Sequence, residues 1–236
     1  MFGKIGVGAV LAGFGAGLIA ALLHFAWVQP LLLQAELYET GALTHFGGGV
    51  MGHGADGHAH AHGMGTAFAG DLARNGLTVL FTALIYLGYA LLLAAAMGLA
   101  AERGVRIDAR RGLIWGAAGF VAVQLAPAMG LPPELPGMAA AEITPRRIWW
   151  ALTVACTAAG LGLLAFGRGW AQWGPALGLL LLPHLVGAPH PHDLFGPTPP
   201  EVASQFAARV LGVGLVAWVC LGGLLGRVIP EAARAP

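Results

Sequence analysis

The stretch IGVGAVLAGFGAGLIAALLHFAWV, at residues 5–28, decides the fold because it contains no Asp, Glu, Lys or Arg. An α-helix rises about 1.5 Å per residue, so roughly 20 apolar residues cross the hydrocarbon core of a bilayer. One basic residue, Lys4, precedes this run. The run is longer than the roughly 7–15 apolar residues of a signal peptide. We therefore predict an uncleaved first membrane span.

Five more apolar segments without acidic or basic residues follow along the chain. They are residues 76–99, 113–129, 148–166, 170–186 and 210–226. Only 10% of the 236 residues are charged, whereas soluble domains carry roughly 25%. The sequence therefore predicts an all-α fold, a polytopic transmembrane helix bundle of six spans that forms one integral membrane domain over residues 1–236. The segment 170–186 is short and ends at Pro183-His184, so a re-entrant segment, which leaves five spans, is the alternative.

The basic residues predict the orientation, because loops on the cytoplasmic side carry an excess of Lys and Arg. Six spans with the N-terminus inside place eight basic residues inside: Lys4, Arg103, Arg106, Arg110, Arg111, Arg168, Arg227 and Arg234. The four outside are Arg74, Arg146, Arg147 and Arg209. In this topology the loops 30–75 and 187–209 both lie outside. They hold seven of the nine histidines: His45, His53, His58, His60, His62, His190 and His192.

The stretch HGADGHAHAH, at residues 53–62, is the strongest chemical signal. Histidine is a common ligand for divalent Zn, Ni, Co and Cu. In an extended chain, His58, His60 and His62 share one face. With His53, they are predicted to form a flexible arm that captures a metal ion. By itself such a tract would hold Cu or Zn more tightly than Co, and a low-complexity linker is the competing interpretation.

A second ligand group is predicted at His190, His192 and Asp193. Prolines surround these residues and stiffen the segment, which favours a defined geometry for a metal ion. The alternative is a proline-rich connector without a ligand role.

Polar residues inside or beside the spans predict a path for the ion. His24 and His184 lie within apolar runs, where an imidazole is costly and indicates function by default. Gln29 and Gln124 are candidates to line the same path. Hydrogen bonds between helices are the alternative role for all four.

Glu36 and Glu39 follow the first span at a spacing of three residues. If the helix continues past residue 28, these carboxylates share a face. We expect them to pass a cation from the histidine-rich loop toward the spans, with ordinary surface carboxylates as the alternative.

Pairs of glycines four residues apart recur in or near the spans and predict close approach of helix backbones. They are Gly13/Gly17, Gly112/Gly116, Gly174/Gly178 and Gly222/Gly226.

A nucleotide-binding motif and a catalytic motif that are both common in enzymes are absent from the sequence. There is no GxxxxGK[ST], the single lysine is Lys4, and the single serine, Ser204, has no GxSxG around it. The net charge of +1 gives no indication of a nucleic-acid partner. We expect no enzyme and no permanently bound cofactor.

Four motifs along the chain carry a family resemblance. They are VQPLLLQAELYE at 28–39, QLAPAMGLPPELPG at 124–137, RIWW at 147–150 and PHLVGAP at 183–189. The four motifs, and their order along the chain, resemble those of the CbtA family of predicted cobalt-transporter subunits. The resemblance implies a multi-pass protein of the bacterial inner membrane that takes up cobalt in connection with cobalamin supply. It also implies a small single-span partner subunit that bears histidines. A homo-oligomer remains open.

Three functions compete at this point. The first is a divalent-metal permease subunit, with external histidines that capture the ion. The second is an accessory protein that binds or senses metal without a path of its own. The third is a membrane redox protein in which His24 and another histidine ligate haem.

Overall fold

The computed structural model describes residues 2–45, 64–167 and 169–234. The regular elements within these ranges are all helices, with no strand, which confirms the predicted all-α class. The elements in chain order are α1 (Phe2–Leu23), η1 (His24–Val28), α2 (Gln29–Glu39), α3 (Met64–Glu102), α4 (Ala109–Phe120), η2 (Val121–Leu125), α5 (Ala126–Ala128), α6 (Ile143–Phe166), η3 (Trp170–Gln172), α7 (Trp173–Val186) and α8 (Pro200–Arg234). Both η1 and η2 are π-helices, and η3 is a 3₁₀-helix.

Each of the six predicted apolar segments is helical. Four of the helices described are long and apolar enough to cross a membrane: Ile5–Glu39, Asp71–Glu102, Ile143–Phe166 and Pro200–Ile229. The other two predicted spans, α4 to α5 and η3 to α7, do not belong to this group. Helices also continue into both segments predicted as external loops, since α2 ends at Glu39 and α8 begins at Pro200.

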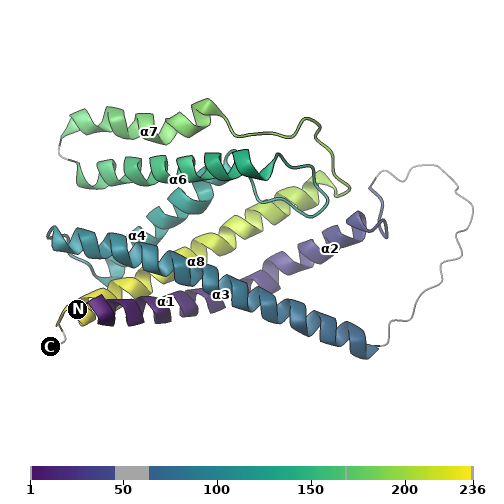
Figure 1. Cartoon of the computed structure of the whole chain (residues 1–236), viewed down its shortest axis with the longest axis horizontal. Coiled ribbons are helices and arrows are strands. Elements are labelled where there is room, and N and C mark those ends of the chain that lie inside the picture. The colour runs from purple at the N-terminus through teal and green to yellow at the C-terminus, as the bar shows by residue number, and fades with distance from the viewer. Residues whose placement is uncertain (1, 46–63, 168, 235–236) are drawn as a thin grey trace, which may run out of the picture.

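Successive helices run back and forth along the long axis of the molecule (Figure 1). Both termini lie at one end, together with the α3–α4 and α6–α7 connections. The opposite end, which we call the loop end, holds residues 39–45, 130–142 and 187–199. Helices α6 and α7 form an antiparallel hairpin, and the indole Nε1 of Trp149 donates to the Pro183 carbonyl at 3.1 Å. Helix α7 therefore returns to the level at which α6 begins.

Glycines hold two helix pairs at backbone contact distance. Where α4 crosses α8, a Cβ on Gly112 or Gly116 would overlap the backbone of α8 at Gly222 or Trp218. In α1, a Cβ on Gly17 would lie 2.7 Å from the Cα of Ala83 in α3, and one on Gly13 would meet Leu87 at 2.8 Å. These contacts confirm three of the four predicted glycine pairs.

The prediction for Gly174/Gly178 is wrong. A Cβ on either residue would meet nothing within 4 Å, so this pair does not pack against another helix in the part of the chain described. Two glycines four residues apart give a helix face without side chains. The spacing alone does not indicate whether a second helix packs against that face.

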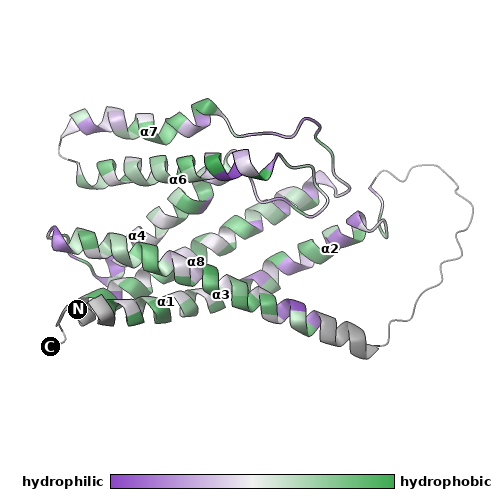
Figure 2. Ribbon diagram, in the orientation of Figure 1, coloured by the Kyte–Doolittle hydropathy of each residue, from purple (hydrophilic) through white to green (hydrophobic). Residues whose placement is uncertain are grey.

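Alanines make up much of the core, and many large apolar side chains of the same helices are exposed. Ala9, Ala16, Ala90 and Ala217 are fully buried, whereas aliphatic side chains of the same helices are exposed, such as Leu92 at 71%. Figure 2 shows the middle of the long helices as hydrophobic, with hydrophilic residues at the loop end of α2 and at the α3–α4 connection. Lipid is the solvent that such a surface fits. 

A second buried cluster at the loop end joins α2, the 130–142 segment and α8. Its members are Val28, Leu31, Ala35, Leu135, Val202, Phe206 and Val213. This cluster holds η1 and α2 against α8.

We expect Gly116→Leu to destabilise the bundle by about 1–3 kcal/mol or more, because the new side chain overlaps the α8 backbone. The matched control is Gly178→Leu, at a position with open space around it. Thermal unfolding of the purified protein in detergent measures both. An equal loss of stability in the two variants would contradict the assignment of the α4–α8 contact.

Candidate functional site

Two helices change to π-helical geometry shortly before a proline. The backbone N–H of Gln29 donates to the His24 carbonyl in η1, and that of Ala126 donates to the Val121 carbonyl in η2. Proline has no N–H and its ring clashes with the preceding helical turn, so a wider turn relieves the conflict. In both helices the proline stands two residues after the π-helix ends. Such π-bulges occur frequently at functional sites.

The two π-helices supply polar side chains to one pocket of about 130 Å³. His24 of η1 and Gln124 of η2 line it, with Thr82 and Tyr86 of α3. The apolar part of the lining is Ala20, Val28, Val210, Val213 and Gly214. The pocket therefore lies where α1, α3, α8 and the helix of η2 meet, within the apolar part of the bundle.

The side-chain oxygen of Gln124 is an unsatisfied acceptor beside this pocket. This oxygen, Oε1, is enclosed and has no hydrogen-bond partner among the described residues. Gly214 makes room for Oε1, since a Cβ at this position would overlap that oxygen. A buried acceptor without a donor is costly.

Arg209 of α8 lies beside the pocket without lining it. Its Nη1 donates to the Trp27 carbonyl, within η1, at 2.9 Å, and its Nη2 lies 3.5 Å from the Gln205 side chain. The guanidinium thus binds the irregular backbone of η1 from the flank. No ion pair of Arg209 occurs among the residues described.

A polar seam between α2 and α3 joins the loop end to the level of the pocket. Gln29 Nε2 donates to Asn75 Oδ1 at 3.2 Å, and Glu36 Oε2 lies 3.3 Å from Arg74 Nη1. The Glu36–Arg74 pair is partly exposed, and such pairs contribute only about 0–1 kcal/mol. The Glu36 carboxylate can therefore exchange Arg74 for another cation at little cost.

The predicted capture residues lie at the loop end or outside the described residues. The four residues that lie outside the described residues are His53, His58, His60 and His62. His45 lies at the start of the gap, and His190, His192 and Asp193 are exposed in the segment before α8. Within the described ranges, no three His, Cys, Asp or Glu residues come together as a metal-holding group. The capture role stays a prediction.

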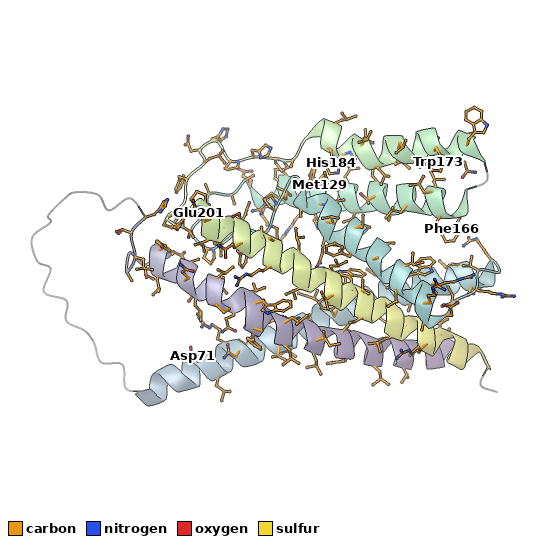
Figure 3. The ribbon with its side chains drawn as sticks, turned by 180° about the vertical axis from the view of Figure 1, so that it is seen from behind. Asp71, Met129, Phe166, Trp173, His184 and Glu201 are labelled. Atoms are coloured by element: carbon orange, nitrogen blue, oxygen red, sulfur yellow. The ribbon has the colours of Figure 1, made fainter. Side chains whose placement is uncertain are left out.

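His184 lies apart from His24. Its ring meets Trp149 of α6 edge-on at a centroid distance of 6.1 Å, and it does not line the pocket of His24. Figure 3 shows His184 toward one end of the α6–α7 hairpin, with Phe166 and Trp173 at the other end. Of the six residues predicted for the path, the structure brings His24 and Gln124 into one pocket. Gln29 and Glu36 lie along the α2–α3 seam, while Glu39 is exposed at the end of α2.

Sequence reasoning missed four residues at this site: Thr82, Tyr86, Arg209 and Gly214. Prolines 30 and 127 inside or beside apolar runs were the available signal for the two irregular turns. Nothing in the sequence pairs these turns with each other, because their meeting depends on how the helices pack.

The model of one protein family matches residues 2–229, and its description is "Probable cobalt transporter subunit (CbtA)". The chain belongs to the CbtA family. The match spans nearly the whole described bundle, so the pocket and both π-helices lie within the family's region. No curated protein and no solved structure matches the chain. As a CbtA chain with apolar helices of membrane length, it is a membrane protein, and the term subunit implies a complex.

We expect Gly214→Ala to lower cobalt uptake severalfold, because the added methyl group displaces the Gln124 oxygen. Gly212→Ala is the control on the same helix, where a Cβ meets nothing within 4 Å. Uptake in cells and thermal stability are measured for both variants. Normal uptake by a stable Gly214→Ala protein would show that the position of Oε1 is irrelevant.

Proposed function

We propose that this chain is the membrane-spanning subunit of a cobalt uptake transporter of the bacterial inner membrane. External histidines capture the ion, and the helix bundle passes it through the pocket of His24 and Gln124. The observation that carries the proposal is the pocket itself, where the polar residues His24, Gln124, Thr82 and Tyr86 line one space among apolar helices. Intramembrane polar groups of this kind mark ion pathways.

Six spans with the N-terminus inside remain the topology that we propose. The helices run alternately between the two ends, and the described segments 39–45 and 187–199, which hold His45, His190 and His192, lie at the end opposite to the termini (Figure 1). Together, η3 and α7 cover residues 170–186, about 25 Å at 1.5 Å per residue. Trp170 and Trp173 are exposed near the α6–α7 connection, at the end of the molecule that holds both termini, and exposed tryptophans suit a membrane interface. A short span such as this one can cross where the bilayer is locally thinner.

In this proposal the ion moves from the loop end toward the pocket in three stages. The histidine tract, together with His190, His192 and Asp193, raises the local concentration of the ion. Glu36 and Glu39 then receive it at the end of α2, and Gln29 lies next on the seam with Asn75. His184 is a separate polar site on the α6–α7 hairpin.

The partner in this proposal is a small single-span subunit that bears histidines, and cobalt supply for cobalamin is the physiological role. The accessory-protein alternative shares the capture histidines but lacks a path. The haem alternative has less support, because His24 and His184 line no common pocket in the described part of the bundle.

Uptake of radiolabelled cobalt, in cells without their own cobalt importers, tests the proposal with and without the partner subunit. We expect the His53/His58/His60/His62→Ala variant to raise the cobalt concentration for half-maximal uptake with little change in maximal rate, because it removes capture only.

His24→Ala is expected to abolish uptake while capture persists, and Thr157→Val, which removes a buried hydroxyl in α6 outside the pocket, is the control. Metal binding without uptake under both partner conditions would favour the accessory protein.

A further inference from the structure

The end of the molecule that holds both termini, which we call the terminal end, carries an excess of positive charge at the α3–α4 connection and on the last turns of α8 (Figure 2). The exposed arginines described there are Arg103, Arg106, Arg110, Arg111 and Arg227, against the carboxylates of Glu102 and Asp108. We infer that Arg110 and Arg227 together bind the phosphate headgroup of an anionic phospholipid. This site lies apart from the proposed ion path and does not depend on it.

Close contacts between α4 and α8 place Arg110 and Arg227 on the same side of the helix pair. A Cβ on Gly223 of α8 would lie 2.9 Å from Leu113 Cδ2 of α4. The two helices run antiparallel, and residues three or four apart share a helix face. Arg110 therefore lies one turn from Leu113, toward the terminal end. Arg227 lies one turn from Gly223 in the same direction, and both arginines are exposed.

No carboxylate neutralises these two arginines in the part of the chain that the structure describes. Neither side chain takes part in an ion pair or a hydrogen bond among the described residues. Asp108 is held by Arg111, because its Oδ1 accepts from the Arg111 backbone N–H at 2.8 Å and its Oδ2 lies 3.7 Å from Arg111 Nε. Two positive charges on neighbouring helices repel each other, so an anion between them is stabilising.

The surroundings of the two arginines favour a phosphate that belongs to a lipid. Guanidinium groups bind phosphate oxygens through paired N–H donors. Toward the middle of the bilayer the same side is apolar, since Leu113 is 43% exposed and Gly223 has no side chain, which leaves a surface for an acyl chain. Trp170 and Trp173 are exposed at the same end and indicate a membrane interface there. Basic pockets between membrane helices bind anionic headgroups in this way.

Lipid titration of the full chain tests the site. The protein is purified in detergent and titrated with phosphatidylglycerol, with zwitterionic phosphatidylcholine as the reference, and native mass spectrometry measures the dissociation constant of the first bound lipid. We expect the parent protein to prefer phosphatidylglycerol. Arg110→Gln and Arg227→Gln are each expected to weaken its binding about fivefold, the effect of one basic residue at an anionic membrane surface. The double variant is expected to lose the preference.

Two further variants separate a site from a general effect of charge. Arg103→Gln removes an equally exposed arginine of the same end, whose Nη1 donates to the Leu99 carbonyl of its own helix at 3.4 Å, and is expected to leave the affinity unchanged. Arg110→Lys keeps the charge but loses the paired donors, so an intermediate affinity is expected. Thermal unfolding without added lipid checks that each variant is folded.

Equal affinity of the parent and the folded double variant for phosphatidylglycerol would overturn the inference. An equal loss in Arg103→Gln would also overturn it, because the attraction would then be spread over the whole end of the molecule. Millimolar inorganic phosphate is expected to leave the lipid bound, since it has no acyl chain. Displacement of phosphatidylglycerol by inorganic phosphate would contradict the assignment to a lipid.

Discussion

The structure depends on the requirement that backbone polar groups inside a membrane find partners within the protein. Pro30 and Pro127 each remove one donor from an apolar helix, and π-helical turns, in which hydrogen bonds join residues five positions apart, form before them. The Trp27 carbonyl finds a further donor in Arg209. Irregular backbone of this kind is tolerated in a membrane where it is buried in protein or lines a cavity, and here both irregular turns border one pocket.

Close helix packing makes that pocket possible. Glycines bring α1 against α3 and α4 against α8 at backbone contact, so the two irregular turns approach from different helices. Gly214 also allows a close approach, here of a side chain, because the Gln124 oxygen occupies the space that a Cβ at position 214 would fill. Packing and function thus rest on one property of the sequence, its abundance of small residues at helix contacts.

The helices could be predicted from the sequence because an apolar run without charges has few alternatives to a membrane helix. Three glycine pairs were also predicted correctly, although Gly174/Gly178 faces open space. The pocket could not be predicted, because His24 and Gln124 are 100 residues apart and their meeting depends on helix rotation and tilt. For the same reason His184, which resembles His24 in sequence context, lies in a different place, against Trp149.

The central claim is that the ion passes through the pocket between η1 and η2. Blocking the pocket covalently tests it most directly, in a chain with Cys156 and Cys220 replaced by Ala and a single cysteine at Val210, which lines the pocket. Labelling with a small hydrophilic thiol reagent should abolish cobalt uptake at Val210→Cys and leave it intact at Gly212→Cys, where the surroundings are open. Undiminished uptake by a fully labelled Val210→Cys protein would contradict the account.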